Sequence, residues 1–189
     1  MINKKFIQKI KTSYSRNEGE RRQIISLSNI VLHDSKRIIF SLHRGEIEQA
    51  KDKFNEIEQI LKKLEKQFGY QRINMEGAYK ASVEEYAEAK MFYLVLTGKK
   101  IDKIVGINLS HESYLGGICD LTGELVRLAI NQAAVGKLKE VTRIKEIINE
   151  IMGELVQFDM TGYLRTKYDQ AKGNLRKIEQ VDYEIKIRK

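Results

Sequence analysis

The chain has 189 residues and a formal net charge of +8, because 34 lysines and arginines outnumber 26 aspartates and glutamates. It has no proline and one cysteine, Cys119, which excludes an intrachain disulfide framework. No run approaches the ~18 apolar residues of a membrane-spanning helix, and the first residues lack the apolar segment of a signal peptide. We therefore expect a cytoplasmic protein without membrane partners. Its basic charge favours polyanions or acidic surfaces as partners.

A chain of this length supports one sizeable core, which predicts a single domain over residues 1–189. Glycines and polar breaks separate blocks whose apolar residues recur at helical spacing. The first three long helices should each hold about 22 to 28 residues, which corresponds to roughly 33 to 42 Å. The fold class is therefore all-α, an elongated bundle of six or seven helices with an apolar stripe left over for a partner subunit. The main blocks lie over about 18–43, 47–68, a stretch ending near 98, 110–136, 141–158 and 164–185.

The stretch EEYAEAKMFY, residues 84–93, places acids on an apolar helix face. Glu85 and Glu88 share this face with Phe92, because residues three and four apart lie above one another on a helix. An unpaired buried carboxylate costs several kcal/mol on the usual order-of-magnitude scale. Each acid therefore needs a cation, a hydrogen-bond donor or an opening to water.

A second acidic stripe lies in GGICDLTGELVRLAIN, residues 116–131, where Asp120 and Glu124 are one turn apart. If this helix packs beside the helix that carries Glu85 and Glu88, the four carboxylates converge. An all-oxygen cluster suits Mg²⁺ or Mn²⁺, which would lower the pKa of a bound water and stabilise the charge that develops in phosphodiester hydrolysis. The same spacing also fits salt-bridged or solvated helix faces, so both interpretations stay open.

Two glycines, Gly116 and Gly117, precede Asp120 by one turn. Glycine inside a helix costs about 1 kcal/mol relative to alanine, which suggests that a partner helix or a ligand approaches the backbone there. Other chemistry has little support, because the sequence contains no P-loop, nucleophile elbow, CxxC pair or ExxH motif. We interpret Cys119 as a small buried residue, and the scattered His33, His43 and His111 as packing or surface residues.

Three segments, in order, carry a resemblance to a known family: SKRIIFSLHR at 35–44, EYAEA at 85–89 and DLTGELVRLAIN at 120–131. They closely resemble translin-associated factor X (TRAX) of the translin family. A fourth segment, KYDQAKGNLRKIEQVDYEIKIR at 167–188, is similar to the ending of both branches of that family. The resemblance extends from about Glu20 to the end of the chain.

The resemblance implies a metal-dependent endoribonuclease that uses Mg²⁺ or Mn²⁺. The acidic residues of the catalytic branch match Glu85, Glu88 and Asp120, with Glu124 as a further ligand or positioning residue. It also implies a helical subunit of a hollow homo-octamer whose acids face the cavity. The expected partners are RNA, single-stranded or in short duplexes, with single-stranded DNA as a further candidate. Two alternatives remain: a translin-like protein that binds nucleic acid without cutting it, and a purely structural helical subunit.

Cations near the acids would be needed to bind RNA phosphates, because phosphate neutralisation supplies most non-specific affinity for nucleic acids. Some of the candidates could instead pair with acids and hold helices together. Arg72 has a neighbour, Tyr70, that could stack on a base while Arg72 meets a phosphate. A lysine-rich stretch before residue 18 is either an RNA-touching arm or a solvated first helix. The candidate nucleic-acid-binding residues are Arg21, Arg22, Lys36, Arg37, Arg44, Arg72, Lys80 and Arg127.

Overall fold

The computed structural model describes residues 1–187 and confirms the all-α prediction, with seven helices and no strand in that range. Arg188, the last residue of the fourth family-like segment, lies outside the described residues. Six helices are long, and α3 is a single turn. In chain order, the helices are α1 (Lys4–His43), α2 (Ile47–Phe68), α3 (Tyr70–Ile73), α4 (Gly77–Leu96), α5 (His111–Ala134), α6 (Leu138–Leu155) and α7 (Gly162–Ile187).

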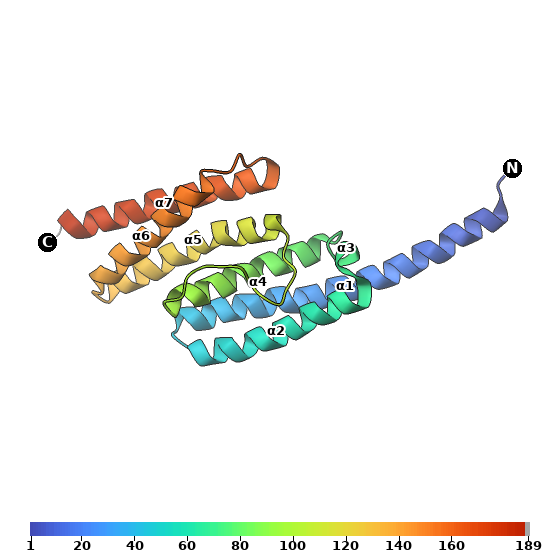
Figure 1. Cartoon of the computed structure of the whole chain (residues 1–189), viewed down its shortest axis with the longest axis horizontal. Coiled ribbons are helices and arrows are strands. Elements are labelled where there is room, and N and C mark those ends of the chain that lie inside the picture. Colours follow the sequence, from blue (N-terminus) through green and yellow to red (C-terminus); the bar gives the residue numbers. More distant parts are fainter. Residues whose placement is uncertain (188–189) are drawn as a thin grey trace.

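The long helices form an elongated bundle with α4 and α5 at its centre (Figure 1). Helix α1 packs against α2 and α4, while α5 packs against α6 and α7. The contact between α4 and α5 joins these two groups and meets the condition under which the acids were expected to converge. Among residues 1–187, no helix is long and apolar enough to cross a membrane.

The predicted helix ends are mostly confirmed. Residues at or next to each end account for where the helix stops or starts. Gly45 and Gly69 follow α1 and α2 with φ angles of 79° and 81°, a left-handed conformation that suits glycine. Ser110 caps α5, because its hydroxyl accepts a hydrogen bond from the Ser113 amide at 3.0 Å. Helix α2 has 22 residues, within the expected range, whereas α4 is slightly shorter with 20.

The start and length predicted for the first helix were wrong. Helix α1 begins at Lys4 rather than near residue 18 and holds 40 residues. The Asn3 side chain caps it by accepting from the Phe6 amide at 3.1 Å, and the chain has no proline to stop the helix. Figure 1 shows its amino-terminal part projecting past the bundle, and residues 1–17 are exposed. This agrees with a solvated helix and leaves contact with RNA a prediction.

The glycine pair on α5 permits close packing against α4. A Cβ atom on Gly117 would lie 3.0 Å from the Ala87 Cβ and 3.0 Å from the Glu84 carbonyl oxygen. A Cβ atom on Gly116 would collide with the Glu84 carboxylate. Of the two explanations that the sequence left open, the partner helix is therefore the one present. This close approach places Asp120, one turn further along α5, near the acids of α4.

Candidate functional site

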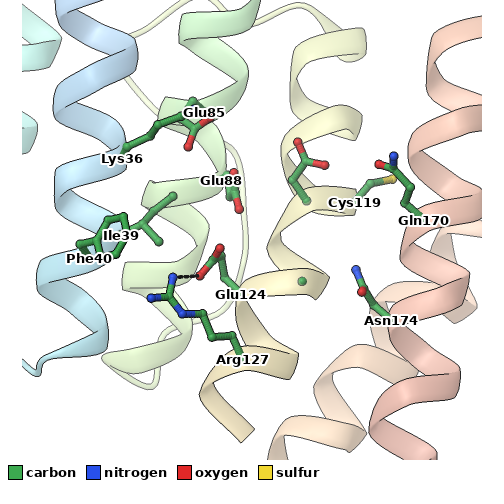
Figure 2. A pocket seen from close by; sticks show the side chains of 12 residues that line it. Lys36, Ile39, Phe40, Glu85, Glu88, Cys119, Glu124, Arg127, Gln170 and Asn174 are labelled. Atoms are coloured by element: carbon green, nitrogen blue, oxygen red, sulfur yellow. Dashed lines mark hydrogen bonds and ion pairs between the residues drawn. The ribbon is translucent and has the colours of Figure 1, made fainter. Parts of the chain in front are cut away.

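The four predicted carboxylates line one cavity of about 650 Å³, which we call the acid cavity (Figure 2). Glu85 and Glu88 come from α4, and Asp120 and Glu124 come from α5. The predicted convergence of these residues is therefore present, because α4 and α5 are neighbours. Helix α1 closes one side of the cavity with Lys36, Ile39 and Phe40, and α7 contributes Gln170 and Asn174.

Glu88 is the most buried of the four acids, with 7% of its surface exposed. Burial, together with the charges of Glu85, Asp120 and Glu124, raises the pKa of Glu88 to about 9. Burial also raises the pKa of Glu85, with additional effects from Asp120 and Glu124, against the opposing charge of Lys36. The Lys36 Nζ lies 3.9 Å from the Glu85 carboxylate. The cavity thus holds carboxylates that repel one another.

Glu124 stays ionised because two groups from different helices bind it. The His43 Nε2–H donates to Glu124 Oε2 at 2.5 Å, and the Arg127 Nη1 lies 3.4 Å from the same oxygen. Burial opposes ionisation, but these contacts lower the pKa of Glu124 overall. The His43 side chain is 5% exposed, and its ring centroid lies 4.8 Å from that of Phe92.

Sequence reasoning missed this role of His43. It identified His43 as a packing or surface residue, and the ring does pack in the interior. A usable signal was present, because Lys36, Phe40 and His43 follow one another at spacings of four and three residues on α1. That spacing places all three on the helix face that meets the acid cavity.

Asp120 is held by a network that also escaped prediction. The Lys167 ammonium of α7 bridges the Asp120 carboxylate and Glu84 Oε1, the latter at 2.9 Å. The Tyr163 hydroxyl donates to the same Glu84 oxygen at 2.5 Å. Burial opposes the charge on Lys167, but its hydrogen bonds to Asp120 and Glu84 raise its pKa above the usual value. Lys167 therefore acts as a fixed cation beside the acid cavity.

The eight predicted nucleic-acid-binding residues do not form one patch. Lys36 and Arg127 line the acid cavity. Arg37 and Arg44 line a neighbouring cavity of about 590 Å³ between α1 and α2, which we call the second cavity. The other four lie outside both cavities, and each has a partner within the chain: Arg21 and Arg72 contact Glu76, Arg22 contacts the Glu18 carbonyl and Lys80 contacts Glu112.

Arg72 illustrates the alternative that a candidate cation pairs with acids and holds helices together. Its side chain is 23% exposed, and it pairs with Glu76 at 2.7 Å and with Glu20 at 3.5 Å. These contacts tie α1 to α3 and to the residue before α4. They favour the role of holding helices together, and a direct contact of Arg72 with phosphate stays a prediction.

The donor chemistry of the acid cavity fits a hard divalent cation, because all four acids offer carboxylate oxygens. Repulsion among the acids adds to burial in raising the pKa of Glu88, and a positive charge among them would offset this repulsion. Among residues 1–187, no three side chains of His, Cys, Asp and Glu already surround a common point as ligands do. The present rotamers instead place Asp120 on Lys167 and Glu124 on His43.

In the absence of divalent cations, we expect the stability of the chain to fall as the pH rises from about 5 to 9. Glu88 titrates at about 9 in the folded chain and near 4.5 otherwise, so in this window the folded state binds more protons than the unfolded state. Stability must then decrease with rising pH. Glu88→Gln should flatten this dependence, measured as melting temperature in the presence of a chelator.

The matched control is Glu179→Gln, which removes a carboxylate from an exposed position of α7. It should keep the wild-type pH dependence. An unchanged slope in Glu88→Gln would show that Glu88 is not the group that titrates.

Fold and cavity together define an all-helical protein with carboxylates and cations gathered between its central helices. A sequence profile of the translin family matches residues 19–189. The chain is 35% identical to chicken (Gallus gallus) translin over 94 residues, which cover 49% of this chain and 41% of that protein. It is 23% identical over 187 residues to a TRAX homologue of Schizosaccharomyces pombe, covering 88% of this chain and 80% of that protein.

The chain belongs to the translin family, which confirms the resemblance seen in the sequence. Its predicted closeness to the catalytic branch stays a prediction. Among solved structures, AfC3PO superposes with a TM-score of 0.87 at 21% identity, covering 97% of this chain and 98% of that one. The complex of AfC3PO with duplex RNA superposes with a TM-score of 0.84 at 19% identity, covering 97% of each chain. These likenesses show a shared fold.

Proposed function

We propose that the chain is an endoribonuclease that depends on Mg²⁺ or Mn²⁺ and cleaves short or single-stranded RNA within a homo-octameric shell. One observation carries the proposal: Glu85, Glu88, Asp120 and Glu124 converge on one cavity that also contains Lys36 and Arg127. Membership of the translin family and the AfC3PO complex with duplex RNA support RNA as the substrate class.

In this proposal, Glu85, Glu88 and Asp120 are the metal ligands, and Glu124 is a further ligand or a positioning residue. A bound Mg²⁺ or Mn²⁺ would offset the charge that develops on the phosphate and would make a water molecule more acidic. Lys36 and Arg127 contact RNA phosphates in this proposal, because they line the same cavity from α1 and α5.

The remaining residues hold the acids in place. His43 keeps Glu124 oriented and ionised through the 2.5 Å hydrogen bond. Lys167 keeps Asp120 at the side of the cavity next to α7. The burial of Glu88 keeps most bulk water from its carboxylate, which strengthens the electrostatic interactions of this group.

Incubation of the purified chain with end-labelled single-stranded RNA tests the proposal. We expect short products with Mg²⁺ or Mn²⁺ and intact RNA with a chelator, because without the metal no water molecule is activated for hydrolysis. Native mass spectrometry of the same sample should show a homo-oligomer with eight copies. RNA retention without metal-dependent products would support the non-catalytic alternative instead. Absence of any salt-dependent RNA binding would leave only the structural subunit.

A further inference from the structure

The aromatic ring of Phe40 lies where the two cavities adjoin. Phe40 belongs to α1 and lines both the acid cavity and the second cavity. Its side chain is 57% exposed, so the ring faces solvent at the mouth of both. A single exposed apolar side chain is common on protein surfaces. The position of Phe40 and the contacts that hold it are what set it apart.

The Phe40 ring is held from α5 by a chain of contacts. The Arg127 guanidinium lies 5.0 Å from the ring centroid. Arg127 in turn contacts Glu124, and Glu124 is bound by the buried His43. The Arg127 contact favours one orientation of the ring, which lowers the entropic cost of binding against it.

Cations flank Phe40 on both sides. Lys36 and Arg127 lie in the acid cavity, and Arg37 and Arg44 lie in the second cavity. The Arg37 and Arg44 side chains are each 66% exposed, and they pair with Asp34 at 3.4 Å and Glu46 at 2.8 Å. Exposed ion pairs are weak, so these guanidinium groups can exchange carboxylate for phosphate. An aromatic ring between cationic groups is the arrangement that binds single-stranded nucleic acid.

We propose that Phe40 is a base-stacking platform that holds one unpaired nucleotide of an RNA strand between the acid cavity and the second cavity. The proposal rests on the proposed function, because it assumes that RNA reaches the acids. It narrows the substrate class to strands with an unpaired base beside the cleaved bond. A base within a duplex already stacks on both faces, so the ring cannot take it without unpairing it.

The test uses the full chain with Asp120→Asn and a chelator, so that bound RNA stays intact. The probe is a single-stranded oligoribonucleotide that contains 2-aminopurine, whose fluorescence is quenched by stacking. We expect quenching on binding to this parent chain. Adding Phe40→Ala should abolish the quenching and weaken single-strand binding by roughly tenfold, while duplex binding changes little. A separate variant with Phe40→Trp in the same Asp120→Asn parent should keep both the quenching and the affinity of that parent.

Phe158→Ala is the matched control, because Phe158 is 51% exposed and lines neither cavity. It should leave quenching and affinity unchanged. The proposal is overturned if Phe40→Ala keeps the quenching, or if it weakens single strands and duplexes equally. It is also overturned if Phe40→Ala instead dissociates the oligomer in native mass spectra, since a second copy of the chain then covers the ring. If the parent chain binds no RNA, the proposed function fails together with this inference.

Discussion

Asp120→Asn is expected to reduce metal-dependent RNA cleavage by roughly three orders of magnitude, because a lost metal ligand removes several kcal/mol of transition-state stabilisation. RNA binding and the fold should survive. Lys167 keeps its contact with Glu84 in the variant, so no buried cation is left unpaired. The measurement is single-turnover cleavage of labelled RNA with Mg²⁺, alongside a binding assay in chelator.

Asp182→Asn is the control for this result. Asp182 is a buried aspartate that pairs with lysines, as Asp120 does, but its partners are Lys145 and Lys186, away from the acid cavity. Its replacement should lower the melting temperature and leave cleavage of the folded protein intact. Cleavage by Asp120→Asn at the wild-type rate would remove Asp120 from the proposed metal site.

Gly117→Leu should destabilise the chain by about 3 kcal/mol or more, because overpacking forces α4 and α5 apart at a backbone contact. Even the first added carbon would lie 3.0 Å from a carbonyl oxygen of α4, and backbone cannot move aside as a flexible side chain does. Urea unfolding followed by circular dichroism measures the loss. RNA cleavage should fall as well, since the acids of the two helices separate.

Gly173→Ala is the control for Gly117→Leu. Gly173 lies inside α7, and an added Cβ atom would have no neighbour within 4 Å. The alanine should stabilise the chain by up to about 1 kcal/mol through its higher helix propensity. If Gly117→Leu unfolds at the wild-type urea concentration, the close approach of α4 and α5 is not essential to the fold.

Local chemistry explains why much of the fold was predictable. Gly45, Gly69 and Ser110 mark helix ends through their own backbone or side-chain preferences, so a short window of sequence is enough to identify them. Helical spacing placed the acids on one face of each helix, but their convergence depended on the packing of α4 beside α5, which the sequence-based prediction held only as a condition. The start of α1 could not be predicted in this way. No residue before position 18 breaks a helix, and the buried residues of α1 begin only at Ile24.

The supporting residues of the acid cavity were harder to predict. Lys167 lies 47 residues beyond Asp120 in the chain, and helical periodicity does not say which helix faces which. The hydrogen bond between Tyr163 and Glu84 forms because α7 packs against α5, which in turn packs against α4. The Glu124 contact with His43 spans 81 residues, so it also depends on tertiary packing.

Helix α1 connects the acid cavity to the exposed amino-terminal segment through one continuous helix of 40 residues. Lys36, Phe40 and His43 lie near one end of this helix, and the exposed segment of residues 4–17 forms the other. At 1.5 Å per residue, Lys4 lies roughly 50 Å from Lys36, so a tilt of about 5° at the cavity moves the tip by roughly 4 Å. Under the proposed function, a strand that tilts α1 at the acid cavity would therefore cause a larger displacement at the exposed end of this helix.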